Sequence, residues 1–191
     1  MKTRKSVQSR KLTTPISVAP CQPLKRLNYF FGQLLSAADL QAEQNYLLGK
    51  HRRHNLRCHG AGIVEGLQVS VSANNAGASV IVAPGFAIDP MGNEVELCAE
   101  AQLNLPAMGK PVYVVISYHE NLTDPIPVLG SPDTNPADAV VYTRTEEAAD
   151  ILILSEVVSP AIALARLVGR GKTWRLDSRF QPLRAKGVQA Q

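Results

Sequence analysis

The segment Leu27–Val69 reads LNYFFGQLLSAADLQAEQNYLLGKHRRHNLRCHGAGIVEGLQV, and its pattern changes twice along its length. It starts with a short apolar stretch that contains three consecutive aromatic residues. Ser36 followed by Asp39 is then typical of an N-terminal capping box, in which each residue satisfies a backbone amide of the other. The Ala, Leu, Gln and Glu content that follows favours helix, so the pattern predicts a helix over Ala37–Cys58.

Gly60 and Gly62 end this helix and turn the chain into an alternating strand pattern that begins at Ile63. At a spacing of three to four residues, one stripe of the helix combines Leu40 and Leu47 with polar side chains, and a second contains Ala38, Ala42, Tyr46 and Gly49. Neither of these two stripes is strongly apolar. We therefore expect the helix to pack against several surfaces, other chains included.

Downstream of the helix, β-branched runs alternate with turn signals such as Pro90–Asn93 and Gly169–Gly171. Pro111–His119 is the most convincing buried strand, whereas 121–138 contains four prolines and predicts a long loop. Several short strands separated by turns indicate a β-sandwich or barrel. The predicted fold class is α+β, mainly β, with one long N-terminal helix packed on an antiparallel β-sandwich or barrel.

These patterns predict four segments. Residues 1–26 form an extended arm, and 27–62 form an aromatic plug and a docking helix. Residues 63–177 form a β-domain that carries the Pro-rich loop 121–138, and 178–191 form a C-terminal tail.

The charge is divided unevenly between the arm and the rest of the chain. The whole chain carries +4, but residues 1–26 contain seven basic residues and no acidic one, which leaves 13 basic and 16 acidic residues elsewhere. The arm can be a solvated tail, can bind an acidic protein groove, or can bind nucleic acid. We predict no nucleic-acid partner, because no aromatic residue interleaves with the first basic cluster. The basic residues of the arm are Lys2, Arg4, Lys5, Arg10, Lys11, Lys25 and Arg26.

Composition narrows the class of protein. Hydrophobic residues make up 45% of the chain, which is enough for a core, and aromatic residues only 5%. The sequence contains no apolar run of about 18 residues, so no membrane span is expected, and no signal segment follows the basic N-terminus. Cys21, Cys58 and Cys98 are too scattered for a disulfide framework, which fits assembly in the cytoplasm.

The residues His51, His54, Cys58 and His59 are the only cluster with metal-ligand character. His51, His54 and Cys58 can share a helix face, but a fourth tetrahedral ligand is missing unless His59 or a distant residue supplies it, and interleaved arginines would repel a cation. Hydrogen bonds to backbone carbonyls near the helix C-terminus, or contacts with an acidic partner, are the alternative roles. We predict neither a metal nor another cofactor, and a zinc enzyme remains the rival hypothesis.

Other catalytic patterns are also weak. The pairs Cys58–His59 and Ser155–His119 lack the strand-to-helix elbow that exposes a nucleophile. Gly60 and Gly62 follow a helix and precede a strand, whereas the glycines of a phosphate-binding fingerprint follow a strand and precede a helix. Asp89 lacks the further spaced carboxylates that a calcium-binding loop needs. The sequence therefore predicts no catalytic site and no enzyme.

Three stretches carry a family resemblance: RLNYFFGQLLSAADLQAEQNYLLGKHRRHN, HGAGIVEGLQV and VAPGFAIDPMGNEV, together with the ending LARLVGRGKTWRLDSRFQPL. Over roughly residues 26–183 the chain resembles small structural proteins of phage-tail-like particles, in particular bacterial contractile injection systems. The resemblance implies a structural part of such a particle: a baseplate-proximal adaptor, a fibre-attachment module, or a plug, cage or cap component. It supplies no catalytic residues.

We therefore predict a homo-oligomeric structural subunit, a trimer or hexamer. Its predicted partners are the baseplate, spike, tube or fibre subunits of the particle. The particle is expected to assemble in the cytoplasm and can be released from the cell. The alternative is a receptor- or glycan-binding β-sandwich module of a tail fibre, with the 121–138 loop near its binding end. The predicted intersubunit contacts lie in the aromatic plug and on the helix: Tyr29, Phe30, Phe31, Gln44, Tyr46, His51, Arg52, Arg53, His54 and Asn55.

Overall fold

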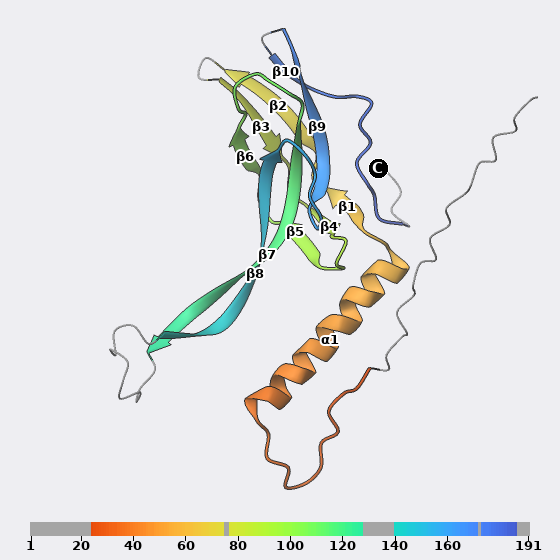
Figure 1. Ribbon diagram of the computed structural model, residues 1–191, viewed down its shortest axis with the longest axis vertical. Coiled ribbons are helices and arrows are strands. Elements are labelled where there is room, and N and C mark those ends of the chain that lie inside the picture. The colour runs from red at the N-terminus through yellow and green to blue at the C-terminus, as the bar shows by residue number, and fades with distance from the viewer. Residues whose placement is uncertain (1–23, 75–76, 128–139, 172, 187–191) are drawn as a thin grey trace, which may run out of the picture. The chain divides into compact units, whose positions relative to one another are not determined.

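The computed structural model describes residues 24–74, 77–127, 140–171 and 173–186. The chain divides into two compact units, residues 1–46 and 47–191. In the described residues, one helix and ten strands follow one another along the chain (Figure 1). They are α1 Ala37–Cys58, β1 Gly62–Gly66, β2 Val69–Asn74, β3 Gly77–Val82, β4 Gly85–Ile88, β5 Glu94–Leu97, β6 Ala101–Asn104, β7 Val112–Pro127, β8 Val140–Leu154, β9 Ile162–Arg170 and β10 Thr173–Leu176.

The strands described by the structure form three antiparallel sheets. Their orders are β1-β4-β5, β2-β3-β6 and β10-β9-β7-β8. All three sheets contribute to one hydrophobic core, with Ile63 from the first, Val80 from the second and Leu167 from the third among its buried members. The mainly β fold with one helix is thus confirmed. The core is aliphatic because Val, Ile and Leu dominate the strands, and Trp174 is its one aromatic residue among those described.

The helix matches its predicted bounds, and both of its ends are closed by the predicted residues. At its start, the Asp39 backbone N–H donates to Ser36 Oγ at 3.2 Å, and the Ser36 N–H donates back to Asp39 Oδ2 at 3.0 Å. The Ser36 hydroxyl also donates to Asp39 Oδ2 at 2.7 Å, and this bond, followed by the one from the Ser36 N–H, lowers the pKa of the Asp39 carboxyl below its usual value. At the other end, the Gly60 N–H donates to the Asn55 carbonyl at 3.0 Å. No helix in the described part of the chain is both long and apolar enough to cross a membrane.

The alternating pattern that starts at Ile63 is two strands rather than one. The chain leaves the first sheet after Gly66 and enters the second at Val69, and between them Leu67 has a φ of +57°. A Cβ on Gly66 would lie 2.2 Å from the Pro84 carbonyl oxygen, so only glycine allows the two chain segments to cross this closely. Period two in the sequence cannot show such a change of sheet, because alternation continues on both sides of it.

The prediction of a loop over 121–138 is wrong for its first part. β7 continues to Pro127 and pairs residue by residue with β8, so that Pro125 lies opposite Tyr142 and Pro127 opposite Val140. The sequence runs at 139–145 and 151–157 each predict a strand of their own, but the structure has one continuous strand there, β8. Residues 128–138 of the predicted loop lie outside the described residues. Prolines are tolerated in this part of β7 because, among the described strands, only β8 pairs with it there, so no second neighbour needs their N–H groups.

The described part of the predicted tail, up to Lys186, is tied to β1. Ile63 N–H donates to the Leu183 carbonyl at 2.8 Å, and Ala185 N–H donates to the Ile63 carbonyl at 3.0 Å. Ala185 is buried as a result. The tail therefore completes the first sheet with a short parallel bridge between Ile63 and Arg184.

Replacing Leu167 by Ala should lower the free energy of unfolding by about 2–5 kcal/mol, because the side chain is fully buried among all three sheets and its removal leaves a cavity. Leu176 lies directly opposite Leu167 in the β9–β10 pair but is 44% exposed, so Leu176→Ala is the matched control, with an expected change of about 0.5 kcal/mol. Urea unfolding of both variants measures the difference. Equal losses would contradict the described core.

Candidate assembly interface

The aromatic plug, residues Tyr29, Phe30 and Phe31, lies exposed at a turn. The turn is closed by the Gln33 N–H, which donates to the Phe30 carbonyl at 3.2 Å. The exposed fractions are 50% for Tyr29, 67% for Phe30 and 105% for Phe31, and Leu34 follows at 92%. Single exposed apolar residues are common, but a consecutive group of large ones is typical of a surface that another molecule covers.

Tyr29 is the one plug residue whose side chain makes a polar contact in the described structure. Its hydroxyl donates to Glu43, on the first half of the helix, and this hydrogen bond raises the pKa of Tyr29 above its usual value. The contact fixes one end of the plug relative to the helix start. Phe30 and Phe31 remain directed to solvent, which is the arrangement that a docking element needs.

Helix α1 is unusually exposed for its length. Among its residues, all of which the structure describes, only Asn55 is buried. Leu40, Leu47 and Leu48 are 52%, 59% and 40% exposed. A helix of this kind gains little from packing inside its own chain, although packing supplies most helical stability in proteins. The helix residues with mixed polar and apolar character therefore remain exposed in the chain.

Asn55 anchors the second half of the helix to the turn between β4 and β5. Its Nδ2 donates to the Gly92 carbonyl at 3.1 Å and to Glu94 Oε1 at 3.2 Å. The side chain is 4% exposed, so these bonds are made away from competing water. Asn55 thus makes these side-chain hydrogen bonds within its own chain.

The turn that receives Asn55 is itself built around a buried carboxylate. Asp89 is 1% exposed, and its Oδ1 accepts hydrogen bonds from the Met91 N–H at 2.7 Å and the Asn93 N–H at 2.9 Å. Its Oδ2 accepts from Asn93 Nδ2 at 2.8 Å. Gly92 lies at the apex with a φ of +89°, and a Cβ there would lie 2.4 Å from the Arg52 carbonyl oxygen. Only glycine therefore lets the helix backbone approach this turn.

Two ion pairs flank this anchor. His51 Nε2 lies 3.2 Å from Glu94 Oε1, and Arg52 Nη2 lies 3.5 Å from Glu120 Oε1. All four side chains are more than one third exposed, so each pair contributes only about 0–1 kcal/mol. Their effect is to orient side chains along the helix rather than to hold it in place.

The residues considered for zinc in the sequence are used in other contacts. His54 Nδ1 lies 3.6 Å from Cys58 Sγ, and the His54 and His59 rings meet edge to face at 5.8 Å. Within the described ranges, no group of three or more His, Cys, Asp or Glu side chains is placed to hold a metal ion.

The structure brings only some of the predicted contact residues together. His51, Arg52 and Asn55 meet around the β4–β5 turn and β7, and Arg53 and His54 are exposed beside them. Gln44 is exposed and Tyr46 half-buried on the first half of the helix. Of the basic arm, Lys25 and Arg26 are described and exposed, whereas Lys2, Arg4, Lys5, Arg10 and Lys11 lie outside the described residues. The intersubunit role of these residues stays a prediction.

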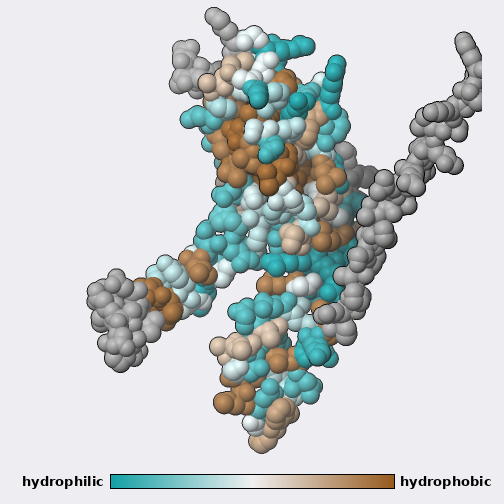
Figure 2. All heavy atoms as spheres, in the orientation of Figure 1, coloured by the Kyte–Doolittle hydropathy of each residue, from teal (hydrophilic) through white to brown (hydrophobic). Residues whose placement is uncertain are grey.

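A second exposed element was not predicted from the sequence. We call it the hairpin arm: residues 121–127 of β7 and 140–146 of β8. β9 pairs only with Val112–Ile116 of β7, so the arm continues alone as a two-stranded ribbon (Figure 1). Apolar side chains gather at its far end (Figure 2). They include Ile126, Val141 and Tyr142, which are 48%, 47% and 53% exposed.

A free two-stranded ribbon is only marginally stable in water, so the hairpin arm is a further candidate for contact with another chain. The signal in the sequence was incomplete. The run 139–145 predicts a strand, but Pro125 and Pro127 concealed its partner strand. A β-branched run that faces a proline-containing one is the pattern of a ribbon whose strands are both edges.

Comparisons with known proteins place the fold. No protein-family model matches the sequence, and no curated protein is found as a relative. Among solved structures, a chain of the type VI secretion TssK-TssF-TssG baseplate subcomplex is similar at a TM-score of 0.51 and 13% identity, over 84% of this chain and 62% of that one. A crystal structure of TssK and a type VI secretion baseplate complex each give 0.49, at 17% and 13% identity, over 84% of this chain and 42% of theirs.

The chain thus spans between about two fifths and three fifths of the length of these baseplate structures. At 13% identity, the likeness to the subcomplex chain is one of fold. It identifies no individual residue of this chain.

The contact between helix and turn predicts opposite effects for two glycines. Gly92→Ala should lower the free energy of unfolding by about 1–3 kcal/mol, because φ is positive and the new Cβ meets the Arg52 backbone. Gly49→Ala should raise it by about 0.5–1 kcal/mol, because Gly49 is in the helix interior and its Cβ would meet nothing within 4 Å. Thermal unfolding followed by circular dichroism compares both with the wild type. Tolerance of alanine at 92 would contradict the close approach.

Proposed function

We propose that this protein is a structural subunit of a contractile injection system or phage-tail-like particle, located near the baseplate as an adaptor, fibre-attachment, plug or cage component. The observation that carries the proposal is the exposed plug together with the nearby Leu34: Phe30, Phe31 and Leu34 are 67%, 105% and 92% exposed. Burial of large apolar side chains is the main driving force of association, and aromatic residues are enriched where it is strongest.

Two further features support this role. The exposed helix and the hairpin arm present elongated surfaces rather than a concave site, as subunits do when they contact several neighbours in a symmetric assembly. The fold likeness to a chain of the TssK-TssF-TssG subcomplex is the second support. By analogy, the partners are other structural subunits of the particle together with further copies of this chain, assembled in the cytoplasm. The proposal includes no catalytic role.

The alternative of a glycan-binding module has lost its main support. It relied on a long loop over 121–138 near the binding end, and the first part of that segment is strand β7. A two-stranded ribbon with exposed apolar side chains is better suited to protein contact than to a sugar, which needs aromatic platforms and polar groups around a hollow.

The test at the level of the particle is sedimentation of the tagged full chain with phage-tail-like particles from cells of its source. Mass spectrometry of the particle fraction and negative-stain electron microscopy identify what it travels with. The proposal expects the chain in the same fraction as baseplate subunits. A chain that remains a monomer and is absent from every particle fraction would overturn the proposal.

The plug is tested separately with the double variant Phe30→Ser/Phe31→Ser. We expect it to weaken self-association or partner binding at least about tenfold, since central aromatic contacts in interfaces are each worth about 2 kcal/mol or more. Its unfolding transition should stay unchanged, because neither side chain is buried within the chain. Val158→Ser is the control, since Val158 is 59% exposed on the β-rich unit. Analytical ultracentrifugation measures association, and a double variant that assembles normally would remove the plug from the interface.

A further inference from the structure

The β9–β10 hairpin gathers arginine side chains on the face directed away from the core. Arg166, Val168 and Arg170 alternate along β9, with buried Leu167 on the opposite, core-directed face. Arg175 of β10 lies directly opposite Val168 in the pair, and cross-strand partners share a face. The two strands therefore bring three guanidinium groups to the same surface.

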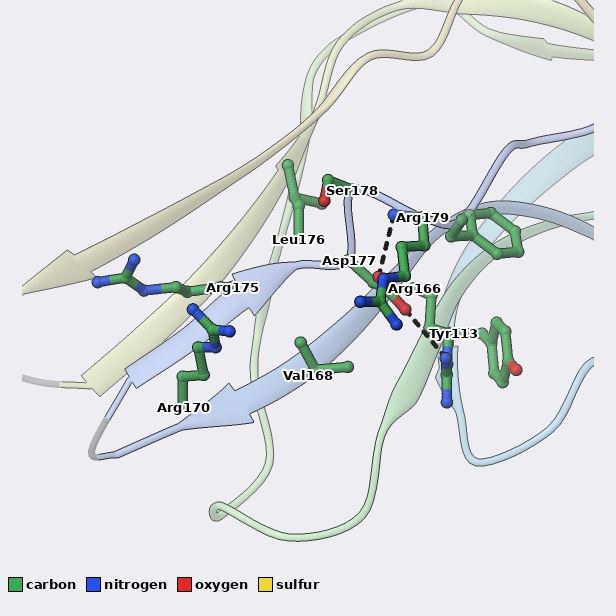
Figure 3. Close-up of a pocket in the computed structure, with 10 residues that line it drawn as sticks. Tyr113, Arg166, Val168, Arg170, Arg175, Leu176, Asp177, Ser178 and Arg179 are labelled. Atoms are coloured by element: carbon green, nitrogen blue, oxygen red, sulfur yellow. Dashed lines mark hydrogen bonds and ion pairs between the residues drawn. The ribbon is translucent and has the colours of Figure 1, made fainter.

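The chain after β10 adds a fourth arginine and closes one side of this surface. Asp177 Oδ2 accepts a hydrogen bond from Arg166 Nη1 at 2.9 Å, and Asp177 Oδ1 accepts one from the Arg179 backbone N–H at 3.1 Å. The ring of Phe180 then meets the Tyr113 ring edge to face at 5.9 Å. The result is an open cavity of about 720 Å³ with the four arginines around it (Figure 3).

The charge of this cavity is not balanced within the described structure. Asp177 is the only carboxylate among the described residues that line the cavity, and it is already engaged by Arg166. The side chains of Arg170, Arg175 and Arg179 form no ion pair with any described carboxylate. Residues 27–191 as a whole carry more acidic than basic residues, so this concentration of arginine is local and is not a consequence of a basic composition.

We propose that this cavity, the arginine pocket, binds an acidic peptide segment of a partner protein. Guanidinium groups pair with carboxylates through two parallel hydrogen bonds, so several arginines select a segment with several Asp or Glu residues. Val168, directly opposite Arg175, lies on the same face as the arginines and can accept an apolar side chain. β10 is also an edge strand of its sheet in the described structure, next to which an extended segment can lie.

The same observations disfavour a nucleic acid. A single strand binds through bases stacked on exposed aromatic rings, but Tyr113 and Phe180 are half-buried and contact each other. The inference rests on the proposed function only in taking the ligand to be part of another subunit. The affinity of the pocket for carboxylates is a property of this chain alone and is tested without the particle.

The test uses the full purified chain and a short fluorescein-labelled peptide of alternating Glu and Val, with binding followed by fluorescence anisotropy. The wild type should bind this peptide and should bind the matched Gln–Val peptide at least about tenfold more weakly, because charge-assisted hydrogen bonds are lost. Raising NaCl from about 0.05 to about 0.5 M should weaken binding to the Glu–Val peptide. Equal affinity for the two peptides would overturn the proposal, and this comparison needs no variant.

The double variant Arg170→Gln/Arg175→Gln should reduce affinity for the Glu–Val peptide at least about tenfold. The control Arg57→Gln/Arg144→Gln removes two exposed arginines outside the pocket and should change affinity less than about twofold. Trp174, the only tryptophan of the chain, is buried in β10 with its Nε1 donating to the Pro106 carbonyl at 3.1 Å, so its emission reports whether the hairpin stays folded. Equal losses in both double variants would overturn the proposal.

Competition separates the sources of negative charge. Inorganic phosphate or a single-stranded oligonucleotide that displaces the labelled peptide more effectively than unlabelled Glu–Val peptide would also overturn it. A wild-type chain that enters particles but does not bind the acidic peptide would leave the proposed function in place and remove this inference. Peptide binding by a chain that never enters particles would support this inference and overturn the proposed function.

Discussion

The side chain of Asn55 donates to the Gly92 carbonyl and to Glu94 across a separation of almost forty residues in the sequence, and the position of the second half of helix α1 depends on it. Because the amide is buried, losing either bond would leave a polar group without a partner. The acceptor carbonyl is correctly placed because Asp89 holds the turn with three hydrogen bonds. Gly92 is required at the apex because any side chain would meet the helix backbone. A polar contact thus does here what an apolar helix face does in most domains.

This way of anchoring has a consequence for the rest of the surface. A helix whose second half is held by one buried amide does not need a strongly apolar stripe, and its leucines remain uncovered. The hairpin arm is uncovered for a related reason, since it extends beyond β9 and no third strand pairs with it in the described structure. Together with the plug, these elements expose apolar surface that a partner can bury. The arginine pocket is different in kind, because its surface is charged and its complement must be acidic.

Features that depend on neighbours in the sequence were predictable. The helix bounds, the reciprocal Ser36–Asp39 cap and strands β5 and β10 follow from hydrogen bonds and periodicities within a few residues. Features that depend on distant neighbours were not. Alternation continues through Leu67, so the change of sheet at that residue left no trace in the pattern. Pro125 and Pro127 indicated a loop in the sequence, yet both lie in β7. A proline is excluded from a strand only where a second neighbouring strand needs its N–H group. The local sequence does not show how many neighbouring strands there are.

The features of the candidate site also differ in whether the local sequence or the tertiary structure sets them. The sequence by itself determined that the plug is aromatic, that the helix has no clean apolar face, and that the β9–β10 turn joins two strands that carry arginine, because these are properties of composition and spacing. Only the tertiary structure decided which polar residue of the HRRHN block is buried. Asn55 is taken into the chain, whereas Arg53 and His54 are left outside. It likewise decided that the segment Asp177–Phe180 folds back beside β9 to make a pocket. Burial and convergence are set by what lies opposite in space, and the local sequence does not contain that information.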